Sequence, residues 1–340
     1  MTEVEIRKLI KQMLYDSRNR ARVSECRLCG QKTEGFCNSH TVPQFILKEL
    51  AQNGKVLQAS LFFGIEHVDI EKGISNSGTF HIICRNCDNS RFTAYENEQA
   101  LLNKPSEKML AQIELKNTLM QLSKRREEVE LYKILYDRGL IEGKEVLDEM
   151  HRLDIRDYNK VIDDAVAFIE NPQDGQYRLI LREVLPYKAP IAVQTPIALH
   201  RDMYDNIVND VYDMSPLVKS EDMHLCIFPL KNQSIILLFY NTKNKKYERF
   251  EQRFKRMKTD VQLQYLNYLV FKYTENYYAS LNLKNEVSKN ENLRALCNEV
   301  YDSTRFGYFS LAELLMPKPP RGIKPYEIPN FLKPNFALTD

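Results

Sequence analysis

The chain has 340 residues, of which 43% are hydrophobic and 28% charged, and its formal net charge is +2. This composition predicts a globular protein with a hydrophobic core, and the small net charge gives no overall attraction to a polyanion. No apolar run reaches the length of a membrane span, and the amino terminus lacks a secretory signal. We therefore expect a cytoplasmic protein with no membrane segment, whose seven cysteines are reduced.

The amino-terminal half is predicted to be helical, apart from one cysteine-rich segment. Residues 2–22 open with a capping-box pattern and carry apolar residues at helical spacing, which predicts a first helix. Apolar spacing and breaker residues predict further helices at residues 45–53, 89–101, 106–136, 144–151 and 156–170. Residues 56–74 and 80–83 are expected to be extended.

The carboxy-terminal half is predicted to mix strands and helices after a turn at residues 171–175. Strands are expected at residues 177–185, 191–199, 225–230 and 234–240, the last two as a hairpin. Helices are expected at residues 247–257 and 260–280, and the proline-rich residues 317–340 should form an extended tail along the surface. The predicted fold class is therefore α+β.

Two Cys-x-x-Cys pairs stand in separate parts of the cysteine-rich segment. Zinc prefers four thiolate or imidazole ligands in a tetrahedron, and two such pairs supply that set. The predicted ligands of a structural zinc ion are Cys26, Cys29, Cys84 and Cys87. Cys37 and His40, which are also three residues apart, could replace one of these pairs. A closed four-thiolate site leaves no open position for water, so its expected role is to hold the fold together.

The order of these features resembles the HNH, or His-Me finger, nucleases: a knuckle, a histidine, a strand, a second knuckle and a helix. It resembles more closely a set of bacterial HNH-like proteins with a Ser-His-Ile-Ile-Pro motif. The matching stretches here are Ser39-His40-Thr41-Val42-Pro43, and Cys84 to Asp88 continuing to Phe92-Thr93-Ala94-Tyr95-Glu96. Ile227-Phe228-Pro229 and Glu275-Asn276 in the carboxy-terminal half also look like this group.

The resemblance implies a treble-clef zinc module and metal-dependent hydrolysis of phosphodiester bonds. His40 would act as the general base on a water molecule, because an imidazole has a pKa near working pH. A catalytic Mg²⁺ or Mn²⁺ ion would be held by Asp88, Asn89 and Glu96. Asn89 and Glu96 are seven residues apart, which places them on one face of the predicted helix.

Three departures from the HNH pattern favour an alternative function. The usual asparagine before the second knuckle is replaced in the region of residues 79–81, Asp88 stands at the place of the usual histidine, and Phe92 near that of the final one. The alternative is a catalytically inactive zinc module that binds nucleic acid or a protein partner. In that case His40 would bond a backbone carbonyl or bind zinc, and Asp88 and Glu96 would be ordinary carboxylates of a first helical turn and the surface.

The resemblance also gives an expected organisation and biological role. The expected parts are a helix at residues 1–24, the HNH-like zinc-binding module at 25–104, a helical segment at 105–175, an α+β domain at 176–316 and a tail at 317–340. The expected function is an endonuclease acting on nucleic acid, DNA ahead of RNA, in defence against foreign nucleic acid. A protein partner, a homo-oligomer, or a sensor function in the carboxy-terminal half is compatible with the same sequence.

One predicted helix carries a basic stripe at three- and four-residue steps. Its members are Lys246, Arg249, Arg253 and Arg256. Such a stripe can contact nucleic-acid phosphates in a salt-dependent way. Glu248 and Glu251 dilute the charge, so a solvated face of an amphipathic helix is the competing interpretation. His81 is expected to pack in the core, and no role is assigned to His67, His151, His200 or His224.

Overall fold

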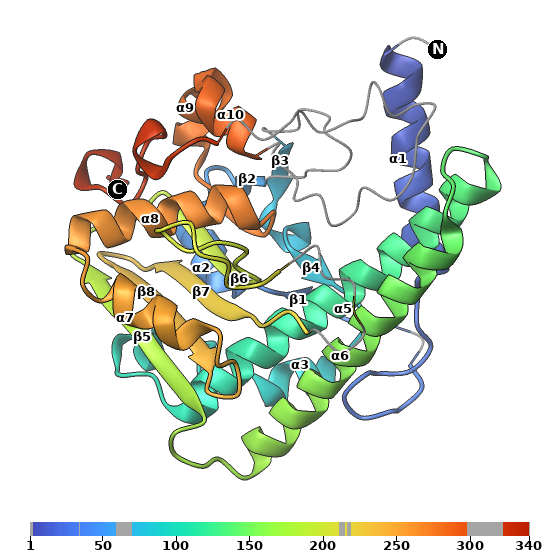
Figure 1. Ribbon diagram of the computed structural model, residues 1–340, viewed down its shortest axis with the longest axis horizontal. Helices are drawn as coiled ribbons and strands as arrows, with labels where there is room; N and C mark the ends of the chain where they lie inside the picture. Colours follow the sequence, from blue (N-terminus) through green and yellow to red (C-terminus); the bar gives the residue numbers. More distant parts are fainter. Residues whose placement is uncertain are drawn as a thin grey trace.

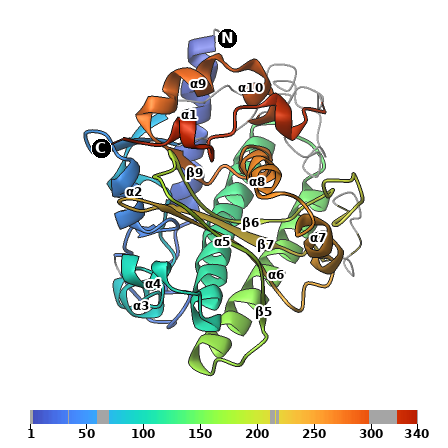
Figure 2. The same cartoon turned by 90° about the vertical axis from the view of Figure 1, so that its left-hand side faces the viewer.

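A seven-stranded antiparallel sheet lies between two layers of helices (Figure 1; Figure 2). The computed structural model describes residues 3–33, 35–58, 70–210, 215, 219–297 and 322–339. The strands are β1 Ser39–His40, β2 Lys55–Gln58, β3 Ile70–Gly73, β4 Thr79–Phe80, β5 Tyr177–Leu185, β6 Ile191–Ile197, β7 Met223–Pro229, β8 Ser234–Asn241 and β9 Tyr277–Ala279. The sheet has the order β3-β2-β9-β6-β7-β8-β5, and β1 pairs with β4 separately. The predicted α+β class is confirmed.

The helices of the described residues divide between the two faces of this sheet. They are α1 Glu3–Arg20, α2 Gln44–Leu50, α3 Arg85–Arg91, α4 Glu98–Leu102, α5 Glu107–Asp137, α6 Lys144–Glu170, α7 Tyr247–Phe254, α8 Thr259–Tyr273, α9 Lys284–Lys289 and α10 Glu291–Cys297. Figure 2 shows α5 and α6 on one side of the sheet and α8 on the other. The cysteine-rich segment packs into the same core as α5, whereas α7 to α10 share the opposite core.

The central strands are buried on both faces, which explains their continuous apolar sequences. Every residue of β7 and β8 is buried. Successive side chains of a strand point to opposite faces. Leu225 and Ile227 accordingly join the core under α7 and α8, while Cys226 and Phe228 join the core under α5. The predicted hairpin of these two strands is confirmed by their antiparallel register.

Helix α5 is the central helix of the fold. It has 31 residues, and the Ser106 hydroxyl accepts a hydrogen bond from the backbone N–H of Met109 at its start. Every residue from 109 to 120 is buried, because the sheet covers one side of α5 and the cysteine-rich segment another. Within the described part of the chain, no helix is both long and apolar enough to cross a bilayer.

Several predicted element boundaries are wrong. The helix expected at residues 89–101 is interrupted: α3 ends at Arg91, and α4 begins after Asn97, whose side chain accepts a hydrogen bond from the N–H of Ala100. The two helices expected within residues 144–170 are the single helix α6. The helix expected at residues 260–280 ends at Tyr273 and is followed by β9, and the strand expected at 80–83 is only Thr79–Phe80.

Segments far apart in the sequence meet in the sheet. Strand β2 pairs with β9, with Leu57 opposite Ala279, so the cysteine-rich segment contributes two strands to the sheet of the carboxy-terminal half. Part of the predicted proline-rich tail lies outside the described residues. In the described part, Phe331 and Leu332 are buried against the core under α8, and the N–H of Leu338 donates to the Lys188 carbonyl oxygen.

Gly78 connects the β1–β4 pair to the large sheet. Its φ angle is +63°, and an added Cβ would lie 1.8 Å from the hydroxyl oxygen of Tyr278. The Tyr278 ring is fully buried, and its hydroxyl donates to the Asn276 side chain at 2.6 Å. The carbonyl oxygen of Gly78 accepts from the N–H of Thr41, the residue after β1, at 3.1 Å.

Gly78→Ala is therefore expected to lower the free energy of unfolding by about 3 kcal/mol, since it combines an unfavourable left-handed backbone with overpacking. Urea denaturation measures this change. Gly54→Ala is the matched control: Gly54 also has a positive φ, +72°, but nothing lies within 4 Å of its added Cβ. Equal losses for the two variants would contradict the proposed contact with Tyr278.

Candidate metal centre

Four cysteine sulfur atoms converge where two distant loops meet. The Sγ atoms of Cys26, Cys29, Cys84 and Cys87 all lie within 4.8 Å of one another. The Cys29 and Cys84 sulfurs are 3.8 Å apart, close to the separation of about 3.8 Å that tetrahedral ligands have with Zn–S bonds of about 2.3 Å. The predicted set of four is confirmed as a cluster, and its donors fit a metal ion such as zinc. Cys37 stands outside this cluster.

The two loops have the local structures that this convergence requires. Gly30 closes the first loop with a φ of +68°, and its N–H donates to the Cys26 carbonyl oxygen at 2.8 Å. In the second loop, Cys84 is the residue before α3 and Cys87 lies in the first turn of that helix. Each pair therefore presents its sulfurs from a tight turn, as the Cys-x-x-Cys spacing predicted.

The thiols of this cluster differ in their surroundings. Burial alone would raise the pKa of Cys26, but backbone N–H donors, including that of Cys84 at 3.2 Å, lower this pKa to about 7. Burial raises the pKa of Cys87, so this group is a thiol at neutral pH until a metal binds. Metal binding to the four sulfurs must therefore release protons.

His40 lies in the short strand beside this cluster. Its Nε2 atom is 2.9 Å from the carbonyl oxygen of Ile74. Burial lowers the pKa of His40, and the nearby positive charge of Lys116 acts in the same direction; hydrogen bonds to the Ile74 and Asn38 backbone and the charge of Asp88 oppose this only in part. His40 is therefore neutral near pH 7. A carbonyl oxygen can only accept, so the single imidazole proton is on Nε2 and the lone pair is on Nδ1.

The carboxylates of Asp88 and Glu96 are joined by Lys116, which the sequence analysis did not select. The Lys116 ammonium is 3.3 Å from Asp88 Oδ1 and also contacts Glu96 Oε1. It lies 4.2 Å from the centroid of the Phe92 ring. Asp88 Oδ1 also accepts a hydrogen bond from the Ser39 hydroxyl at 2.5 Å. Burial raises the pKa of Glu96, and the Lys116 charge lowers it by less.

The predicted ligand set for a catalytic Mg²⁺ or Mn²⁺ ion does not fit this arrangement. A divalent ion would need the carboxylate oxygens that contact the Lys116 ammonium, and the ammonium would repel it. Asn89 is exposed on α3, which ends two residues later, so the prediction that Asn89 and Glu96 share a helical face is wrong. Asp88 and Glu96 do lie together, through a lysine rather than through a shared helix.

The predicted basic stripe lies on α7 and at its ends, on the opposite face of the sheet from the cysteine cluster. Two of its members make internal contacts. Lys246 Nζ donates to the Lys219 carbonyl oxygen at 2.7 Å, and Arg253 forms an ion pair with the buried Asp202. Arg249 and Arg256 are exposed. A nucleic-acid contact by this stripe stays a prediction, and it would be made at a surface separate from His40.

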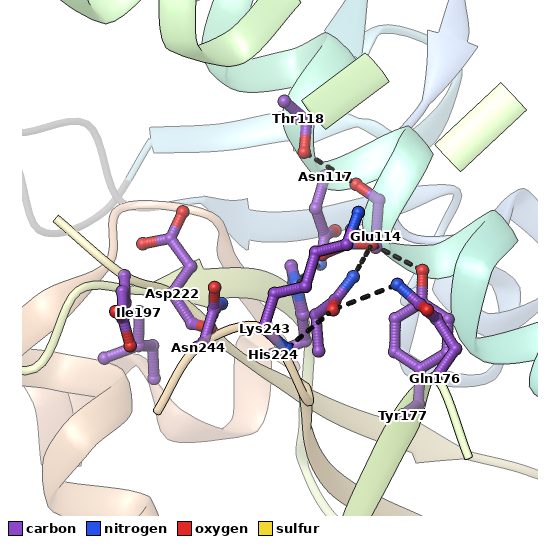
Figure 3. Close-up of polar contacts among 12 residues, drawn as sticks. Glu114, Asn117, Thr118, Gln176, Tyr177, Ile197, Asp222, His224, Lys243 and Asn244 are labelled. Atoms are coloured by element: carbon purple, nitrogen blue, oxygen red, sulfur yellow. Dashed lines mark hydrogen bonds and ion pairs between the residues drawn. The ribbon is translucent and has the colours of Figure 1, made fainter. Parts of the chain in front are cut away.

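A second buried polar cluster lies between α5 and the sheet, and the sequence analysis missed it (Figure 3). Glu114 accepts hydrogen bonds from the Tyr177 hydroxyl and, at 3.3 Å, from the Asn241 side chain. His224 Nε2 is 3.4 Å from the other Glu114 oxygen, and His224 Nδ1 is 3.1 Å from the Asn117 side chain. Burial alone would raise the pKa of Glu114, but these partners, His224 first, hold it below its ordinary value.

The sequence contained a signal for both buried polar groups, the one around Lys116 and the one around Glu114. Between Ile113 and Leu119, polar residues occupy several sides of the predicted long helix rather than one solvated face. Such a helix must bury polar groups, which then need partners. His81 gave a misleading signal: it is exposed, and its Nε2 atom is 2.8 Å from the Asn38 side-chain oxygen, so the prediction of a core residue is wrong.

These features define an α+β protein with a cluster of four cysteines, close enough together to hold a metal ion, beside a short β1–β4 ladder and α3. The cluster is the best-defined candidate site of the described residues. Neither a protein-family model, nor a curated protein, nor a solved structure matches the chain. Function must therefore be argued from the residues themselves.

Proposed function

We propose that the chain is a hydrolase of phosphodiester bonds in nucleic acid, DNA ahead of RNA, with zinc on the four cysteines and His40 as general base. The observation that carries the proposal is the position of a neutral imidazole beside a carboxylate, on a segment whose two ends meet at the four-cysteine cluster. The cluster fixes both ends of the segment, since Cys26 and Cys29 precede β1 while Cys84 and Cys87 begin α3. A role in defence against foreign nucleic acid is part of this proposal.

The protonation state of His40 suits a general base. The Ile74 carbonyl oxygen fixes the tautomer, and burial favours the neutral form at working pH. In the proposed step, Nδ1 takes a proton from a water molecule while the water oxygen attacks phosphorus. The bond to the leaving oxygen breaks, and that oxygen takes a proton from solvent. The zinc ion takes no part in this step, because four cysteine ligands leave it no open position.

His40→Ala is expected to reduce cleavage by about 10²–10⁴-fold, the usual contribution of a positioned general base. The assay is nicking of supercoiled plasmid by the zinc-loaded chain with Mg²⁺ or Mn²⁺, alongside EDTA, with zinc content measured for each sample. His81→Ala is the matched control, because His81 follows β4 and is exposed. Equal cleavage by His40→Ala and the wild type at equal zinc content would remove His40 from the mechanism.

One observation favours a second function, a catalytically inactive zinc module that binds nucleic acid or a protein partner. The two carboxylates proposed to assist catalysis are both paired with Lys116. The hydrogen bond from His40 to a backbone carbonyl is also the contact expected of a structural histidine. Nucleic-acid binding without cleavage under every metal condition would support this second function over the first.

A further inference from the structure

Lys116 is an unusual residue for the middle of a buried helix. Only 1% of its surface is exposed, and the residues on either side, Leu115 and Asn117, are fully buried. An ammonium ion in a protein interior is stabilised only if opposite charges and hydrogen bonds replace water. Here the ammonium is compensated by Asp88 from α3 and Glu96 from the turn before α4, and by the face of Phe92.

The oxygens around Lys116 have the features of a cation site. They come from two separate elements and converge on one nitrogen atom. Ser39 donates to the Asp88 oxygen that faces the ammonium, which fixes the orientation of that carboxylate. Carboxylate oxygens are also the ligands preferred by Mg²⁺ and Mn²⁺. A divalent ion bound by the same oxygens would lie within a few ångströms of the ammonium, where the repulsion is strong.

We infer that Asp88 and Glu96 form a cation site whose resident occupant is the Lys116 ammonium, so that Mg²⁺ and Mn²⁺ are excluded from it in the wild-type chain. This inference rests on the proposed function only for its biological meaning. With both carboxylates ionised, one ammonium leaves an excess negative charge, which does not attract a phosphodiester. The described structure then corresponds to a resting site, and hydrolysis with a divalent ion requires displacement of Lys116.

The test measures binding of Mn²⁺ alone to the zinc-loaded full-length protein. Bound Mn²⁺ is quantified from the loss of the EPR signal of the free ion. The wild type and Glu96→Gln should bind Mn²⁺ equally, because neither protein has both carboxylates, Asp88 and Glu96, available to the ion. Lys116→Met should gain about one Mn²⁺ equivalent, with affinity about 100-fold above the wild type, the size of effect that one neighbouring charge has on a titrating group. Adding Asp88→Asn to Lys116→Met should remove the gain.

Lys133→Met is the matched control, because Lys133 is also on α5 but is partly exposed and paired with Glu130. It should bind Mn²⁺ as the wild type does. Wild-type binding of one Mn²⁺ that Glu96→Gln abolishes would overturn the inference, and this comparison does not depend on Lys116→Met being folded. A folded, zinc-loaded Lys116→Met that gains no Mn²⁺ would also overturn it. If Lys116→Met gained Mn²⁺ but no variant cleaved nucleic acid, the inferred cation site would be supported and only the proposed hydrolase function would be contradicted.

Discussion

Cys84→Ser is expected to abolish stoichiometric zinc binding and to unfold the segment that carries β1, β4 and α3. Cys84 belongs to the sulfur cluster and also starts α3, so its loss removes a ligand and frees the helix from the first loop. Structural zinc contributes about 10–16 kcal/mol of apparent binding free energy in small peptides, which makes this the largest effect expected from one residue. Elemental analysis and limited proteolysis between residues 26 and 96 measure the two changes.

Cys37→Ala is the control for this experiment. Cys37 lies close to the cluster, with its sulfur 3.6 Å from the Ile83 carbonyl oxygen, and burial raises its pKa to about 11. Its sulfur stands outside the group of four that lie within 4.8 Å of one another, so it is not part of the proposed ligand set. The variant should keep one zinc ion. If Cys37→Ala lost zinc and Cys84→Ser retained it, the zinc ligands would include Cys37 and His40 in place of one Cys-x-x-Cys pair.

Glu114→Gln is expected to lower the free energy of unfolding at neutral pH by about 2 kcal/mol, because it removes a charged acceptor shared by His224, Tyr177 and Asn241. The folded-state pKa of Glu114 is below its ordinary value. Its contribution is therefore complete above the unfolded pKa and is lost as pH falls through the folded pKa. The difference between variant and wild type should shrink on acidification, as urea denaturation at several pH values can measure.

Glu130→Gln on the same helix is the matched control. Glu130 pairs with Lys133, whose side chain is 42% exposed, and pairs of this kind contribute little. Its effect should be small at every pH. A Glu114→Gln variant that matched this control would mean that the buried cluster adds nothing to stability, and a difference that grew on acidification would contradict the direction of the Glu114 pKa shift.

The parts of the fold predicted correctly are those set by local chemistry. Cys26 and Cys84 each open a Cys-x-x-Cys turn, and this spacing needs no knowledge of the rest of the chain. The bounds of α5 followed from the proline before it and from helical spacing, and the hairpin of β7 and β8 followed from apolar runs around a polar turn. These patterns act over a few residues, which is why sequence reasoning finds them.

The polar contacts of the candidate site depend on tertiary packing, which local patterns do not contain. Lys116 reaches Glu96 across 20 residues, and Glu114 reaches His224 across 110. The helix expected through residue 101 failed for a similar reason: the buried rings of Phe92 and Tyr95 hold that stretch in a non-helical turn against α5. Helical spacing therefore predicted that Asn89 lies next to Glu96, whereas in the packed structure Lys116 is the residue that contacts Glu96.

The position of β9 in the sheet has a consequence for synthesis of the chain. β9 is the only link between β2 and β6 in the strand order, and it is made after all the other strands described. While the ribosome is still translating the residues before it, β2 and β6 each present an unpaired edge, and such edges invite association with other chains. The nascent polypeptide should therefore need a chaperone longest at this seam.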